Sequence, residues 1–239
     1  PSDDTLRRFF RRLDADKFEA CFIEWLQSFQ LSLTNKVVAI DGKTSRRSFD
    51  GNHKAMHMVS AFVSELGLTL GQLKTETKSN EITAIPKLLK LLDLQGAIIT
   101  IDAMGCQTKI VETIVDQKAD YLISLKGNQS GLNDDVRLFF ESPSKQANIE
   151  QCVKHEKGHG RLEKRTCRVA KEINWLKERH PHWTDLTSIV ELESERDIQG
   201  QLTQEKRYYI SSLASTPNQL LSNIREHWGI ENKLQDRKS

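Results

Sequence analysis

The sequence predicts an α/β fold, a mixed sheet with flanking helices and a β-rich insertion before the last helix. Apolar runs typical of buried strands alternate with segments of helical periodicity, at 37–40, 82–94, 97–101, 107–118 and 121–125. Two β-rich stretches, 56–63 and 68–73, are separated by a turn at Gly67, which indicates antiparallel strands added to the same sheet. A polar region with alternating apolar residues follows, including 161–169, 187–192 and 207–210, and predicts the insertion.

These patterns divide the 239 residues into four expected parts. Residues 1–33 form an N-terminal segment of two helices, 34–140 the first part of the core, 141–215 the insertion, and 216–239 the last core helix. That helix starts at Thr216-Pro217, a hydroxyl N-cap followed by proline at the first helical position. Because the residues after Leu234 are all polar, we expect the helix to be truncated.

Composition excludes several classes of protein. The hydrophobic fraction of 37% is enough to bury a core, and the formal net charge of +2 is too small to indicate nucleic-acid binding by itself. No apolar run reaches about 18 residues, so we expect no membrane span. The four cysteines are widely spaced and form no CxxC pair, which favours reduced thiols and a cytoplasmic protein.

Two aspartates occupy the same kind of position. Asp41 and Asp102 each follow a short apolar strand and precede a small residue. Side chains at the carboxyl ends of strands in an α/β sheet face the crevice where ligands bind. Two carboxylates placed there repel each other unless a cation or proton lies between them, and Mg²⁺ prefers such oxygens. The alternative is that both are turn formers, since Asp-Gly is a common way to leave a strand.

A third acidic residue falls on the apolar side of the last helix. At about 100° per residue, Glu231 lies about 20° from Leu220, close to Ile224. A carboxylate facing the sheet there costs several kcal/mol unless it is paired, protonated or bound to metal. Glu231 is therefore a candidate metal ligand, or else a buried acid paired with His227 or an arginine.

Five motifs together resemble the H-repeat-associated proteins of Rhs elements, a family of insertion-sequence transposases with a DDE-type active site. They begin at Val38 (VAIDGK), Thr100 (TIDAM), Leu125 (LKGNQ), His159 (HGR) and His227 (HWGIENKL). The resemblance runs over essentially the whole chain. It implies an RNase H-like fold, with two aspartates on neighbouring strands, a glutamate on a late helix, and a β-rich insertion between the second aspartate and the glutamate. One departure is His227, where related transposases have arginine.

The resemblance implies a DNA transposase catalytic domain that performs metal-dependent cleavage and strand transfer at insertion-sequence ends. Asp41, Asp102 and Glu231 would hold Mg²⁺ or Mn²⁺, as two ions. The partners implied are double-stranded DNA with the transposon ends and a second copy of the chain as a homodimer. Candidates for DNA contact are Lys43, Arg46, Arg47, Lys126, Asn128, His159, Arg161 and Arg165. The alternatives are an inactive remnant that only binds DNA or a protein, and a nuclease of the same fold without strand transfer.

Overall fold

The computed structural model describes residues 2–28, 32–45, 56–75, 80–142, 148–158, 161–198 and 200–230. Four of the residues predicted to function in DNA cleavage or binding lie outside these ranges: Arg46, Arg47, His159 and Glu231.

A single nine-stranded sheet organises the molecule. Its strands are β1 (Val37–Ser45), β2 (Met56–Val63), β3 (Leu68–Thr75), β4 (Ile98–Ile101), β5 (Asp120–Leu125), β6 (Ile149–Gly158), β7 (Arg161–Ala170), β8 (Ser188–Ile198) and β9 (Gln201–Ser211). The first five lie in the order β3-β2-β1-β4-β5. Strands β1, β3, β4 and β5 run in one direction, and β2 runs in the opposite direction. This is the strand order of an RNase H-like fold, so the predicted fold class is confirmed.

The segment between β5 and the last helix is β-rich, as predicted, but its strands extend the core sheet. Hairpins β6-β7 and β8-β9 pair with each other, and β9 pairs antiparallel with β5. The strands predicted at 187–192 and 207–210 are longer than expected, and β6 was not located from the sequence. The reason is visible in β9, where residues 201–206 are all exposed, so the outer half of the strand has no buried face to produce an apolar alternation.

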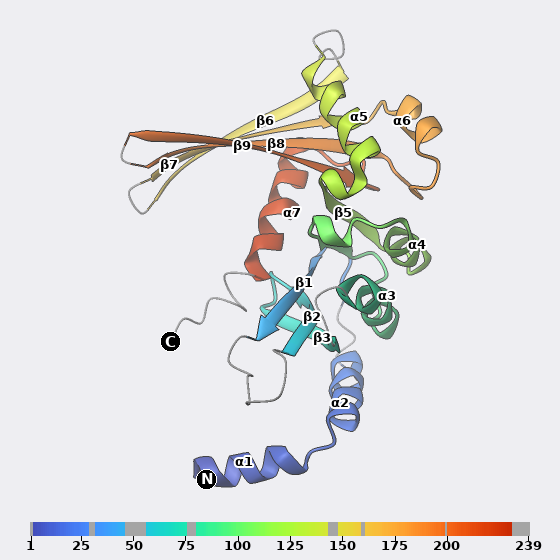
Figure 1. Cartoon of the computed structure of the whole chain (residues 1–239), viewed down its shortest axis with the longest axis vertical. Coiled ribbons are helices and arrows are strands. Elements are labelled where there is room, and N and C mark those ends of the chain that lie inside the picture. Colours follow the sequence, from blue (N-terminus) through green and yellow to red (C-terminus); the bar gives the residue numbers. More distant parts are fainter. Residues whose placement is uncertain are drawn as a thin grey trace.

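Helices cover both faces of the sheet (Figure 1). The helices of the described residues are α1 (Asp3–Arg12), α2 (Ala15–Ser28), α3 (Glu81–Leu91), α4 (Thr108–Asp116), α5 (Ser130–Glu141), α6 (Asn174–Arg179) and α7 (Pro217–Gly229). The main core joins α3, α4 and α5 to one face of the sheet, whereas α7 packs on the opposite face. Within the described residues, no helix is both long and apolar enough to cross a bilayer.

Two helices have features of note. Helix α3 begins one residue before the predicted segment 82–94 and ends at Leu91, and Pro86 lies in its second turn. Proline there cannot donate the usual hydrogen bond to the preceding turn. Helix α1 buries none of its residues and lies at the end of the molecule away from the hairpins (Figure 1).

Candidate active site

Parallel pairing of β1 with β4 brings Asp41 and Asp102 side by side. Ile40 is the register partner of Ile101, and each aspartate is the next residue along its chain. Side chains alternate between the two faces of a sheet along each strand. Val37 and Ile98 both pack against α7, and Asp41 and Asp102 each follow by four positions, so they lie on the same face as these residues. Both carboxylates therefore belong to the α7 face, on adjacent strands, as the strand-end positions predicted.

The two aspartates differ in backbone context. Strand β1 continues through Asp41 to Ser45, paired only with β2, so the expectation that the strand stops at Asp41 is wrong. Asp102 does follow the last residue of β4. It is the N-cap of η2 (Ala103–Gly105), and its Oδ1 accepts from the backbone amides of Met104 at 3.1 Å and Gly105 at 3.4 Å. Asp41 is half-buried and Asp102 exposed.

Helix α7 approaches the aspartates with its C-terminal turns. It starts as predicted, with Thr216 as N-cap in a capping box with Gln219. Its far end is held on the sheet because the Ser64 hydroxyl donates to the carbonyl of Glu226 at 2.6 Å. A Cβ on Gly229 would meet Ser64 Oγ at 2.7 Å, so glycine is what lets the helix come this close.

His227 links α7 to β4. Its Nδ1 lies 2.9 Å from Thr100 Oγ1, two residues before Asp102. Burial lowers the pKa of His227 below its usual range, although the charges of Asp41 and Asp102 act in the opposite direction. The imidazole is therefore held largely neutral beside the two carboxylates.

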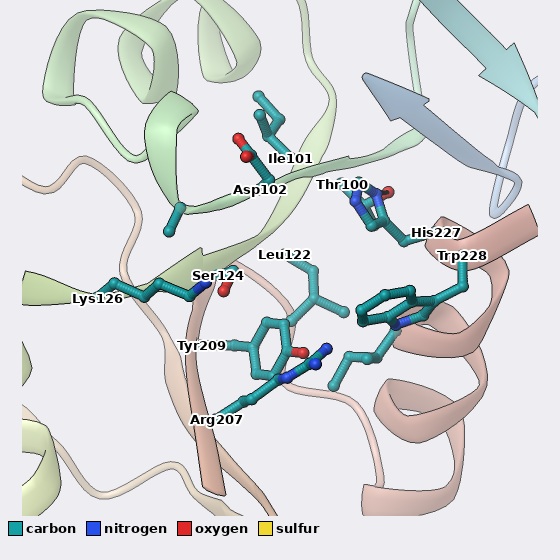
Figure 2. Close-up of a pocket in the computed structure, with 12 residues that line it drawn as sticks. Thr100, Ile101, Asp102, Leu122, Ser124, Lys126, Arg207, Tyr209, His227 and Trp228 are labelled. Carbon is teal, nitrogen blue, oxygen red and sulfur yellow. Dashed lines mark hydrogen bonds between the residues drawn. The ribbon is translucent and has the colours of Figure 1, made fainter. Parts of the chain in front are cut away.

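A cavity of about 200 Å³ opens next to Asp102 (Figure 2). Lys126, from the end of β5, and Arg207, from β9, both reach it. The Arg207 guanidinium carbon lies 4.5 Å from the centre of the Trp228 ring, and Glu205 accepts from two of the Arg207 nitrogens at 2.8 and 3.0 Å. The Trp228 ring and the Glu205 carboxylate together fix the orientation of this guanidinium at the cavity wall.

The residues predicted to bind DNA differ in their surroundings. Lys43, Lys126 and Asn128 are exposed, and only the backbone of Arg161 is described. Arg165 forms ion pairs with Glu156 and with the buried Glu163, both at 2.7 Å. Its side chain is only 15% exposed, and its pairing with Glu156 links β7 to β6, while its contact with DNA stays a prediction.

Three cavity residues, Arg207, Tyr209 and Trp228, were not predicted as site residues. The sequence places Trp228 in the HWGIENKL motif without a role of its own, and 207–210 is expected only as a strand of the insertion. No local signal marks Arg207 and Tyr209, because their strand β9 reaches the site by pairing with β5 from a distant part of the chain.

Comparison with known proteins identifies the family. The model described as "Transposase DDE domain" matches residues 32–239. The chain belongs to this transposase DDE domain family. A Xanthobacter autotrophicus protein described as lying in the dhlA 3' region is 42% identical over 219 residues, which are 91% of this chain and 74% of that protein. "H repeat-associated putative transposase YhhI" of Escherichia coli K12 is 41% identical, over 98% of this chain and 64% of that protein.

The predicted resemblance to H-repeat-associated transposases is thus confirmed. The chain is shorter than these family members, spanning about two thirds of YhhI. A solved piggyBac transposase synaptic complex with hairpin DNA also matches, with a TM-score of 0.49 and 11% identity over 97% of this chain and 46% of that chain. This likeness is too distant to add to the strand order described above.

The two aspartates of this DDE domain offer the kind of donor atom that a divalent metal ion prefers. Asp41 and Asp102 offer carboxylate oxygens from adjacent strands, which hard cations such as Mg²⁺ prefer. Within the described ranges no group of three or more His, Cys, Asp or Glu side chains is placed to hold a metal ion. The third expected ligand, Glu231, lies outside those ranges.

Proposed function

We propose that this chain is the catalytic part of an insertion-sequence transposase, cutting DNA at the element's ends and joining the ends to a target. The observation that supports it most is the pairing of Ile40 with Ile101, which places Asp41 and Asp102 next to each other on the α7 face. Family membership supplies the reaction class. The boundaries of the core, at 34–140 and 216–239, and of the insertion, at 141–215, are part of this proposal.

Glu231 is the proposed third carboxylate. Ile230, the residue before it, is fully buried and keeps helical backbone angles (φ −65°, ψ −41°). In a helix, residues four apart lie on the same side, about 6 Å apart along the axis. Glu231 follows His227, whose ring reaches Thr100, by four positions in the sequence.

Metal ions bound here, two of Mg²⁺ or Mn²⁺, would activate water or a DNA 3'-hydroxyl and stabilise the leaving oxygen. Asp41, Asp102 and Glu231 would hold them, while Lys126 and Arg207 bind phosphates of the strand that enters the cavity. His227, kept neutral, orients the end of α7 through Thr100.

Double-stranded DNA carrying the transposon ends is the proposed substrate. With a net charge of only +2, attraction to DNA must come from local groups of Lys and Arg. Lys43, Lys126 and Arg207 are the described candidates, with Arg46, Arg47, His159 and Arg161 added from the sequence. Removing one side chain that binds a phosphate should reduce the slope of log affinity against log salt by about 1. A homodimer that holds both ends is also proposed.

The decisive experiment measures Mg²⁺-dependent nicking of DNA bearing the element's ends, followed by joining of 3'-hydroxyl ends to a target. We expect Asp102→Asn to abolish both steps and to leave the unfolding temperature close to that of the parent. Nicking without joining would indicate a nuclease. DNA binding without metal-dependent nicking would indicate an inactive remnant, and either result would overturn the proposal.

A further inference from the structure

Two neighbouring loops meet at the edge of the sheet beside Asp102. Strands β4 and β5 pair in parallel, with Ile101 opposite Ile123, so both end at the same edge. Each strand is followed by one turn of 3-10 helix, η2 (Ala103–Gly105) after β4 and η3 (Gly127–Gln129) after β5. The η3 turn belongs to the LKGNQ motif, for which only DNA contact was expected.

Two side-chain amides of η3 hold the loop that follows Asp102. Asn128 Nδ2 donates to the carbonyl of Ala103 at 2.7 Å, and Gln129 Nε2 donates to the carbonyl of Cys106 at 2.8 Å. Both donors are uncharged, and both acceptors are main-chain carbonyls. The two hydrogen bonds hold the segment 103–106 at its first residue, Ala103, and at its last residue, Cys106.

This segment fixes the direction of the Asp102 carboxylate. Oδ1 of Asp102 accepts from the amides of Met104 and Gly105, so the carboxylate turns with the loop. The opposite side of the loop is closed by the core. A Cβ on Gly105 would meet Ile101 Cγ2 at 2.2 Å, and Cys106 is fully buried. The core therefore restrains the segment 103–106 on one side, and the side-chain amides of Asn128 and Gln129 restrain it on the other.

We propose that Asn128 and Gln129 are positioning residues that hold Asp102 in its metal-binding orientation. This rests on the proposed function, in which Asp102 is a metal ligand. Lys126, on the same loop, lines the cavity (Figure 2). The LKGNQ motif thus has two separable tasks: Lys126 contacts DNA phosphate, while Asn128 and Gln129 act on the carboxylate through the backbone.

The test measures metal and DNA affinity separately. Mn²⁺ binding to the DNA-free protein is followed by electron paramagnetic resonance, and duplex binding by fluorescence anisotropy with Ca²⁺ in place of Mg²⁺. Loss of a partner that orients a metal ligand typically weakens metal binding about 10- to 100-fold. We expect Asn128→Ala to weaken Mn²⁺ binding at least about tenfold and to leave duplex affinity unchanged. Lys126→Ala should weaken duplex binding and leave Mn²⁺ affinity unchanged.

Controls separate the possible failures. Gln201→Ala removes an exposed carboxamide from the start of β9 and should change neither affinity. If Asp102→Asn leaves Mn²⁺ affinity unchanged, the proposed function itself fails. If Asp102→Asn weakens Mn²⁺ binding but Asn128→Ala does not, only the positioning role is lost. Weaker DNA binding with intact Mn²⁺ affinity would make Asn128 a direct DNA contact. Gln129→Ala, which removes the second bond, provides the same test if Asn128→Ala does not fold.

Discussion

Gly42, directly after Asp41, has no room for a side chain. A Cβ there would lie 2.4, 2.5 and 2.6 Å from the three atoms of the Glu81 carboxyl group, all inside contact distance. Glu81 is 7% exposed and is the first residue of α3, which packs on β2 and β3. The carboxyl group is the flexible end of its side chain, but because Glu81 is buried it has little space to move, so Gly42→Ala must push this group against its neighbours or bend β1. Forcing extra volume into such a site typically costs about 1–3 kcal/mol.

For a domain of this size, that cost should lower the unfolding temperature by about 2–12 °C. The assay is thermal unfolding followed by circular dichroism, with Mn²⁺ affinity measured in parallel, because a bent β1 also moves Asp41. Gly127→Ala is the matched control for the unfolding temperature alone, since a Cβ at Gly127 meets nothing within 4 Å. Adding Glu81→Ala to Gly42→Ala should recover part of the stability, as a double-mutant cycle would show. If Gly42→Ala unfolds at the parent's temperature, the close approach to Glu81 is not a constraint and the reasoning is wrong.

Three further outcomes are expected. Arg207→Gln should weaken DNA binding and reduce its salt slope by about 1, whereas an unchanged slope would place Arg207 outside the DNA path. Thr216→Ala should cost about 1 kcal/mol in urea unfolding through loss of the N-cap of α7, and a neutral result would show that the capping box does not stabilise the helix. The folded-state pKa of His227 is lowered, so its contribution to stability is complete above the unfolded value of about 6.5 and is lost as pH falls through the folded pKa. The metal-free parent should lose more stability than His227→Gln in that acidic window, and parallel profiles would refute this.

Much of the fold could be predicted because local pattern and tertiary role agree. The apolar runs before Asp41 and Asp102 are buried strands on both faces, so hydrophobicity located them correctly. The start of α7 at Thr216-Pro217 could be predicted because the N-cap hydrogen bond joins residues only three positions apart. The extension of β1 past Asp41 could not be seen, because residues 42–45 are stabilised by pairing with β2 and not by an apolar pattern of their own.

The candidate site was predictable only in part, for a related reason. Strand position and the family resemblance mark Asp41 and Asp102 as neighbours, but no such signal shows that β9 will pair with β5 and bring Arg207 to the same site. The resemblance implied a DNA contact for Arg165; its partner Glu163 lies two residues away on β7, but its other partner, Glu156, becomes visible only when β6 and β7 are paired. The same holds for Asn128, because its acceptor, the carbonyl of Ala103, lies on another strand's loop.

The pairing of β5 with β9 has a consequence for how the chain folds. Leu122 lies opposite Ser211, 89 positions later (211 minus 122), so the core sheet cannot be completed from local contacts. Hairpin β8-β9 closes over a short turn and can form early, whereas its docking must overcome the entropy of closing a long loop. Until it docks, the edge of β5 presents unpaired amides and carbonyls to other chains. We therefore expect hairpin docking to limit the folding rate, and an undocked chain to be the form most prone to aggregation.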